Sequence, residues 1–294
     1  MSANEDRSTS KKSTCDSNVM LSSKPTADDG NIHSIATSDI FERTGNSPQT
    51  HPSHADEVVT TWETHISQII LDRMYEESTP LLKASQSGMY RPFMVAIAGI
   101  PGSGKTTSAA ILSDILRNEH GISNVVVPMD GYHYSLENLR SFDNPQDAIY
   151  RRGAPDTFDT SSLRNDLSRI RDGDEGTIFI PGFDHALGDP KIDQYKFSRE
   201  EHQLVICEGL YLLHDEDGWD GTSCLFNFSI FVQADIDLCV MRLKERNKCI
   251  PGYTPEEIDI RCDCVDRANA HTVQASQKNA DIIVKSIAAK MRVA

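Results

Sequence analysis

The chain has 294 residues, enough for one large domain or two small ones, and it carries a formal net charge of −15 at pH 7. A strongly acidic chain repels polyanions, so we expect neither nucleic acid nor an anionic membrane as a partner. No apolar run reaches the roughly 20 residues that span a bilayer, and the N-terminus has no apolar signal core. The seven cysteines form no C-x-x-C pair, which is typical of reduced thiols in a cytoplasmic protein.

The N-terminal part of the chain differs in composition from the rest. Residues 1–55 are rich in Ser, Thr, Asn, Asp and Pro and contain few large apolar side chains. Such a segment buries too little apolar surface to offset its chain entropy, so we predict a disordered tail. A folded domain is expected over residues 56–294. It begins with an amphipathic helix at 56–77, where apolar residues recur every three or four positions.

From residue 92 to the end, short apolar strands alternate with helical segments. Strands are expected at residues 93–98, 125–127, 177–180, 204–207, 229–232 and 282–284. Helices are expected at residues 105–118, 161–170, 236–247 and 255–276. This alternation predicts an α/β fold in which a parallel sheet carries helices on both faces.

A phosphate-binding pattern lies between the first of these strands and its helix. Residues 99–106 match G-x-x-x-x-G-K-[ST] in full, and the strand before and helix after them are the context that this P-loop motif requires. Glycines let backbone N–H groups turn toward phosphate oxygens, and the helix adds its positive end. The chemistry assigns Lys105 to the β- and γ-phosphates and Thr106 to Mg²⁺. The alternative, a Gly-rich turn with an incidental lysine, does not explain this context. The predicted nucleotide site for Mg-ATP comprises Gly99, Ile100, Pro101, Gly102, Ser103, Gly104, Lys105, Thr106 and Thr107, together with Arg242 from the later helix at 236–247.

Two further strands end in carboxylates. Asp130 follows the second strand and Glu208 follows the strand at 204–207. Ligands of open α/β sheets bind beyond the carboxyl ends of the strands, so both carboxylates are expected near the γ-phosphate if their strands neighbour the P-loop strand. Asp130 suits the general base that accepts the substrate's proton, and Glu208 suits a magnesium-organising carboxylate. The structural alternative is that Asp130 only forms a turn before Gly131 and that Glu208 only caps a helix or forms a turn.

Several loops could form a polar substrate pocket. Cations, aromatics and acids gather in three of them, as such a pocket requires, although ordinary surface loops have similar compositions. The candidate substrate residues are His133, Tyr134, Arg152, Phe158, Phe183 and His185. On the helix at 236–247, Arg242 and Arg246 lie four residues apart on one face. A loop and a helix with a capping box follow, so the segment around 242–257 is predicted to be a lid that places an arginine on the transferring phosphate. The alternative is a solvated basic helix face.

Together these segments resemble the phosphoribulokinase/uridine kinase family of P-loop kinases, in particular its nucleoside-kinase-like and pantothenate-kinase-related branch. The resemblance rests on residues 99–107, 128–133, 152–159, 181–185 with 189–190, and 208–213. It implies the P-loop NTPase fold, a three-layer sandwich of parallel sheet and helices. It also implies that Asp130 is the base and Arg246 the lid arginine, with Phe158, Phe183 and His185 beside the acceptor. The substrate loop typical of uridine kinases is absent, so the acceptor does not follow from the resemblance.

The sequence therefore predicts an ATP-dependent kinase of a small hydroxyl-bearing metabolite, such as a nucleoside, a pantothenate-like compound or a sugar, acting as a monomer or homodimer. The alternative is a P-loop ATPase or nucleotide-binding regulatory module that acts on a protein partner. No N-K-x-D motif is present to read a guanine base, and Asp130 indicates a substrate proton to remove.

Overall fold

The computed structural model describes residues 34–35, 61–84, 91–173, 175–184, 187–248 and 253–286, with side chains described to residue 77 in the first helix. The predicted disordered tail lies outside these residues, apart from β1 (Ser34–Ile35), which forms a short strand paired in parallel with β8. The predicted N-terminal helix is present as α1 (Trp62–Ala84), shifted toward the C-terminus relative to residues 56–77.

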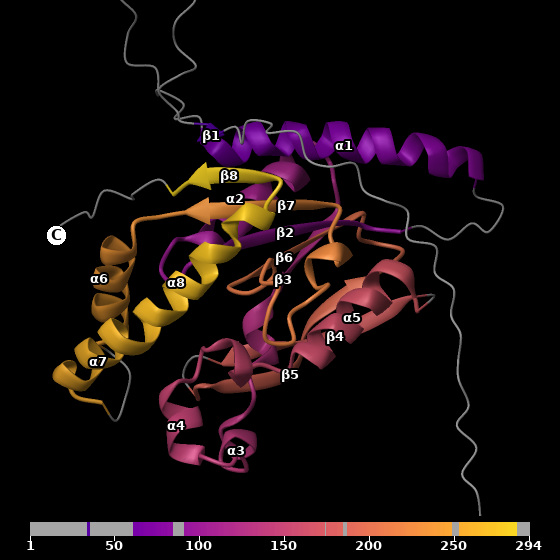
Figure 1. Cartoon of the computed structure of the whole chain (residues 1–294). Helices are drawn as coiled ribbons and strands as arrows, with labels where there is room; N and C mark the ends of the chain where they lie inside the picture. Colours follow the sequence, from indigo (N-terminus) through magenta and orange to yellow (C-terminus); the bar gives the residue numbers. More distant parts are fainter. Residues whose placement is uncertain are drawn as a thin grey trace, which may run out of the picture. The chain divides into compact units, whose positions relative to one another are not determined.

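The described residues form a parallel sheet in the order β1-β8-β7-β2-β6-β3 (Figure 1). Its strands after β1 are β2 (Phe93–Gly99), β3 (Asn124–Pro128), β6 (Leu204–Gly209), β7 (Phe228–Gln233) and β8 (Ile282–Lys285). The P-loop strand β2 is central, with β6 on one side and β7 on the other. Every residue of β2 and β6 is buried, as expected for strands that carry helices on both faces. The predicted parallel α/β sandwich is thus confirmed.

Helices cover both faces of the sheet (Figure 1). On one face, α1 and α2 (Lys105–Asn118) pack on alternate residues of β2 such as Val95 and Ile97. On the other face, α5 (Thr160–Asp172) and α8 (Arg267–Ala275) pack on the residues between, such as Met94 and Ala96. This period of two is what a strand buried between two layers requires.

One predicted strand does not belong to the main sheet. The segment at 177–180 lies in β4 (Thr177–Asp184), which pairs antiparallel with β5 (Asp189–Ser198) in a separate two-stranded sheet. Along β4, buried and exposed residues alternate at first, the pattern of an antiparallel strand with one solvated face, whereas β6 is buried throughout. The sequence did not predict β5, because its residues are mostly polar and form no apolar run.

The C-terminal helices differ in detail from the prediction. The α6 helix (Ile236–Asn247) has the predicted bounds, and with α7 (Pro255–Arg261) it lies beyond the carboxyl ends of β7 and β8 (Figure 1). The predicted helix at 255–276 consists of α7, a π-helical turn η4 (Cys262–Asp266) and α8. Short elements not predicted are α3 (Leu136–Leu139), α4 (Pro145–Tyr150), and the 3₁₀ turns η1 (Met129–Tyr132), η2 (Pro155–Thr157), η3 (Ser223–Leu225) and η5 (Ser276–Asn279).

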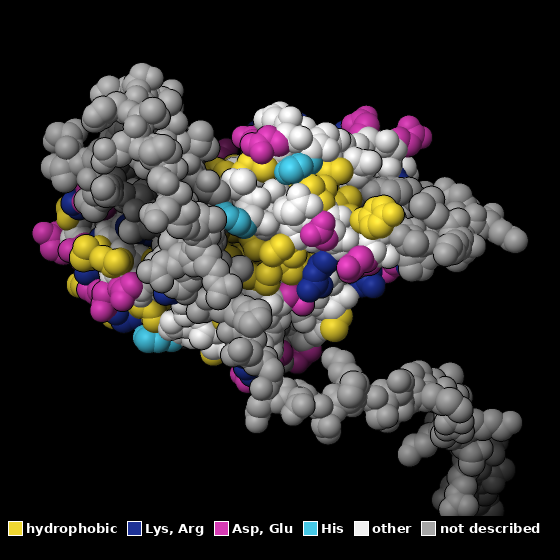
Figure 2. Space-filling model, turned by 90° about the horizontal axis from the view of Figure 1, so that it is seen from above, with side chains coloured by type: hydrophobic (Ala, Val, Ile, Leu, Met, Phe, Trp, Pro, Cys, Tyr) yellow, Lys and Arg dark blue, Asp and Glu magenta, His cyan; other side chains and the backbone are white. Residues whose placement is uncertain are grey.

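The described part of the face that α1 covers carries side chains of both charges (Figure 2). Figure 2 shows Lys, Arg, Asp and Glu side chains scattered there among apolar and neutral ones, within the part of the surface that is described. Among the described residues, no helix is long and apolar enough to cross a membrane.

Candidate active site

The P-loop lies at the carboxyl end of the central strand. Gly102 and Gly104 have φ of 79° and 91°, a left-handed conformation that favours glycine. A Cβ atom on Gly102 would stand 2.9 Å from the carbonyl oxygen of Cys239 in α6, so glycine also permits this close packing. The Ser103 hydroxyl is buried without a hydrogen-bond partner among the described residues. A glycine-rich loop with an unpaired buried hydroxyl, followed directly by the N-terminal end of α2, suits an anionic ligand.

A cavity of about 320 Å³ opens beside this loop, and its lining residues come from the P-loop, α2 and α6. They are Gly102, Gly104, Lys105, Thr106, Thr107, Arg242, Leu243 and Arg246. The structure therefore brings both arginines of the predicted lid to the predicted nucleotide loop. Arg242 Nη1 also donates a hydrogen bond to Gly102 O at 3.3 Å. Residues 249–252 of the predicted lid lie outside the described residues.

Glu208 connects the P-loop to the neighbouring strand β6. Its side chain is buried, and its Oε1 accepts a hydrogen bond of 3.0 Å from Thr106 Oγ1. Burial raises the pKa of the Glu208 carboxyl, the nearby Asp130 carboxylate raises it further, and Lys105 and the Thr106 hydrogen bond act in the opposite direction. The carboxylate thus lies in the field of both Lys105 and Asp130. The Thr106 hydroxyl and a buried, incompletely compensated carboxylate are oxygen donors that fit Mg²⁺.

Asp130 reaches the same edge of the sheet because of how β3 ends. Pro128 pairs with Glu208 in the β3–β6 register, so the two carboxylates follow neighbouring strand ends. The strand ends approach closely at Gly209, where a Cβ atom would stand 2.5 Å from the Cβ of Met129. The predicted convergence of Asp130 and Glu208 on the P-loop is therefore supported by strand order, register and packing.

Aromatic side chains predicted to lie near the acceptor gather around His133. The His133 ring lies 4.0 Å from the Phe158 ring and 4.9 Å from the Phe183 ring, between centroids. Its Nδ1 is 2.8 Å from the carbonyl oxygen of Asp130, and because a carbonyl only accepts, Nδ1 is the donor. The cluster is thus bonded directly to the residue predicted to be the base.

The other two described substrate candidates have partners within the chain. Arg152 donates to Tyr134 O and to Asp189 Oδ1, both at 2.8 Å, and to Gly188 O. Its guanidinium also lies 5.4 Å from the centre of the Phe183 ring. These contacts connect the turn of the β4–β5 hairpin, at Gly188 and Asp189, to the segment after η1. A direct contact of Arg152 or Tyr134 with substrate stays a prediction, and His185 lies outside the described residues.

Two contributions to the site were not predicted from the sequence. Tyr195 on β5 is half-buried, and burial together with the Glu208 and Asp130 carboxylates raises the pKa of its phenol. It went unnoticed because β5 itself carries no strand signal. Arg261 in α7 donates through Nη2 to Arg152 O at 2.8 Å, so α7 holds the loop that contains the predicted substrate residue Arg152. No motif marks that contact.

The fold and the site define a P-loop kinase, and comparison with known proteins gives its family. The chain belongs to the Phosphoribulokinase / Uridine kinase family, whose model matches residues 94–292. A Schizosaccharomyces pombe protein with the name "Putative uridine kinase C227.14" is 32% identical over 222 residues, which cover 74% of this chain and 92% of that protein. The ATP-dependent kinase YFH7 of Saccharomyces cerevisiae is 40% identical over 124 residues, but this match spans only 34% of YFH7.

Solved structures agree with this family. The crystal structure of a "putative fructose transport system kinase" from Silicibacter sp. TM1040 has a TM-score of 0.62 and 26% identity, covering 76% of this chain and 98% of that one. Saccharomyces cerevisiae YFH7 has a TM-score of 0.56 at 20% identity over 72% of this chain and 98% of that one, which shows the shared fold. The protein is therefore a small-molecule kinase that uses ATP with Mg²⁺ to transfer a phosphoryl group to a hydroxyl.

Proposed function

We propose that the two strand-end carboxylates divide the chemistry of this transfer. Asp130 is the general base, and Glu208 with Thr106 holds Mg²⁺, which when bound neutralises charge on the phosphates. The observation that carries the proposal is the buried Glu208 carboxylate, which is hydrogen-bonded to Thr106 and lies in the field of Lys105 and Asp130. The proposed magnesium-binding carboxylate, the proposed phosphate-binding lysine and the proposed base therefore influence one another at the carboxyl edge of the sheet.

In the proposed step, the acceptor hydroxyl gives its proton to the Asp130 carboxylate while its oxygen forms a bond to the γ-phosphorus. The bond from that phosphorus to the oxygen bridging to the β-phosphate breaks, and ADP leaves with the electron pair. Lys105 and Arg246 stabilise the negative charge on the transferred group, because preorganised cations need little reorganisation during the reaction. Both residues line the same cavity. Arg242, also in that lining, completes the proposed ATP-binding set.

The proposed acceptor is a small polar metabolite: a nucleoside, a pantothenate-like compound or a sugar. Among these candidate acceptors we favour a nucleoside, because the name of the Schizosaccharomyces pombe relative includes uridine kinase. In addition, the rings of His133, Phe158 and Phe183 offer aromatic surface on which a base or a sugar ring can pack. We extend the proposal to a cytoplasmic location, which suits the five described cysteines, all free thiols, and to a monomer or homodimer.

The test is ADP release from Mg-ATP with uridine, cytidine, pantothenate, glycerate and simple sugars as candidate acceptors. We expect at least one to stimulate turnover, and we expect Asp130→Asn to lower that stimulated rate about 10²- to 10⁴-fold because the base is lost. The KM for ATP should stay near the wild-type value. Hydrolysis that no acceptor stimulates and that survives Asp130→Asn would contradict the proposal and indicate a P-loop ATPase or a regulatory module.

A further inference from the structure

The loop at residues 151–158, which we call the acceptor loop, is connected to the candidate base Asp130 through Phe158 and His133. Phe158 ends this loop, forms an antiparallel bridge with His133, and packs against the His133 ring at an interplanar angle of 38°. The His133 ring in turn donates to Asp130 O. Two backbone bonds flank the bridge, from Tyr134 N to Thr157 O and from Asp159 N to Tyr132 O, at 2.9 and 2.8 Å. Displacement of the loop would therefore carry His133 and the Asp130 backbone with it.

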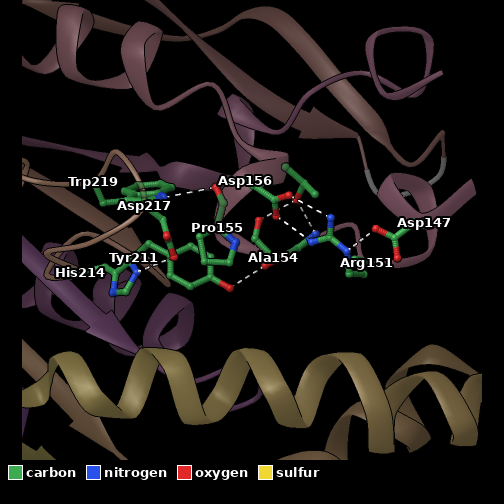
Figure 3. A network of polar contacts seen from close by, with 11 residues as sticks. Asp147, Arg151, Ala154, Pro155, Asp156, Tyr211, His214, Asp217 and Trp219 are labelled. Atoms are coloured by element: carbon green, nitrogen blue, oxygen red, sulfur yellow. Dashed lines mark hydrogen bonds and ion pairs between the residues drawn. The ribbon is translucent and has the colours of Figure 1, made fainter. Parts of the chain in front are cut away.

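Two fully buried side chains donate hydrogen bonds to carbonyl oxygens of the acceptor loop. Tyr211 Oη donates to Gly153 O at 2.7 Å, and Trp219 Nε1 donates to Pro155 O at 3.2 Å (Figure 3). Both residues belong to the segment that follows β6 and Glu208, and both have 0% exposure. Two separate carbonyl oxygens of one loop are thus fixed by buried donors from a single segment of the chain.

The same two rings also support Phe158. The Tyr211 and Trp219 rings meet the Phe158 ring edge-on, at centroid distances of 5.7 and 5.9 Å and interplanar angles of 74° and 75°. They also contact each other at 5.3 Å. Edge-to-face packing of this kind restricts the tilt of a ring as well as its position. The orientation of Phe158 under His133 is therefore set by Tyr211 and Trp219.

We propose that Tyr211 and Trp219 are positioning residues for phosphoryl transfer, which hold the acceptor loop so that Phe158 and His133 keep Asp130 in place to take the acceptor's proton. This inference rests on the proposed role of Asp130. Simple core packing would also bury two aromatic side chains. It does not account for both polar groups bonding to one loop, or for both rings contacting the residue that supports His133.

The experiment compares Tyr211→Phe and Trp219→Phe with wild type in the full chain, each variant keeping an aromatic ring and losing a donor. For each we expect kcat with the stimulating acceptor to fall about tenfold, since the hydrogen bond that fixes a carbonyl oxygen of the loop is lost, while the KM for ATP stays within about twofold. Ser113→Ala is the matched control. It removes a buried hydrogen bond of 2.6 Å to Asn124, between α2 and β3 and away from the acceptor loop, and should leave acceptor turnover unchanged.

A double-mutant cycle separates this inference from the proposed function. If the aromatic pair acts through Asp130, Tyr211→Phe should lower the stimulated rate much less in an Asp130→Asn background than in wild type. Equal losses in both backgrounds, or equal changes in the KM of ATP and acceptor, would overturn the positioning role while leaving Asp130 as base. An Asp130→Asn protein of wild-type rate would overturn the proposed base and this inference together. Should one aromatic variant fail to fold, the other gives the same reading.

Discussion

The proposed nucleotide side and the proposed acceptor side of this kinase are built in different ways. Residues of the P-loop and of the start of α2, among them Lys105 and Thr106, form most of the proposed nucleotide side, to which α6 and Glu208 contribute from elsewhere in the chain. The proposed acceptor side is assembled from η1, the acceptor loop, the β4–β5 hairpin, the segment after β6, and α7. The predicted phosphate-binding residues therefore come largely from one short stretch of sequence, whereas the geometry of the proposed acceptor site depends on contacts between distant segments.

The largest expected effect tests the nucleotide side alone. Lys105→Ala should lower acceptor-stimulated turnover about 1,000-fold, because a preorganised cation beside the transferring phosphate is lost. The KM for ATP should also rise, since Lys105 lines the cavity itself. Steady-state kinetics measure both. Lys278→Ala, which removes an exposed lysine paired with Asp215, is the control and should retain full activity. A Lys105→Ala protein with wild-type kinetics would contradict the assignment of this cavity to ATP.

The next effect should fall on the acceptor side alone. A Cβ atom on Gly131 would stand 2.2 Å from Pro181 O, so Gly131→Ala must push η1 away from the hairpin. We expect a loss of unfolding free energy of about 1–3 kcal/mol and at least tenfold slower acceptor turnover, with the KM for ATP nearly unchanged. Gly176→Ala is the matched control, because nothing lies within 4 Å of its Cβ. If Gly131→Ala raised the KM for ATP as strongly as it lowered turnover, the two sides would not be separable.

A smaller effect concerns Glu208, where the two sides meet. Burial raises the pKa of its carboxyl, so the stability linked to this group is present below its unfolded pKa and lost as the pH rises through the folded one. Without ligand, Glu208→Gln should therefore melt at a higher temperature than wild type at pH 8, with the gap shrinking toward pH 5. Each unit of pKa shift corresponds to about 1.4 kcal/mol. Scanning calorimetry measures the gap, and a gap that did not change with pH would exclude burial as its cause.

The smallest effect is expected at the outer edge of the acceptor loop. Arg151 is paired there with Asp147 and with both oxygens of Asp156 (Figure 3), but its side chain is 38% exposed. Exposed ion pairs contribute about 0–1 kcal/mol, so Arg151→Gln should change acceptor turnover less than twofold. Tyr211→Phe, acting on the buried side of the same loop, should have the larger effect. The reverse order would mean that the outer pairs, and not the aromatic rings, hold the loop.

The same contrast explains which features could be predicted from the sequence. The P-loop, α2 and the strand-end carboxylates were evident because each depends on neighbouring residues and on apolar runs. The strand β5 was missed because its pairing with β4, not its composition, makes it a strand. Tyr211 lies in the segment 208–213 that carries the family resemblance, but no role was predicted for it or for Trp219, since an apolar segment shows that a ring is buried but not which carbonyl oxygen its polar atom will meet. Arg152 was proposed for substrate, while its partners Asp189 and Gly188 come from a hairpin that the sequence did not predict.

The hydrogen bond from Arg261 to Arg152 O has a consequence for anyone who wishes to re-engineer this enzyme. It anchors α7 to the acceptor loop, and α7 shares a small apolar cluster with α6 through Ile258, Val240 and Leu243. Grafting a relative's acceptor loop onto this chain would thus also change the packing of α7 against α6, the helix that carries Arg242 and Arg246. A successful transplant needs the loop, α7 and the segment after β6 to be exchanged together as one module.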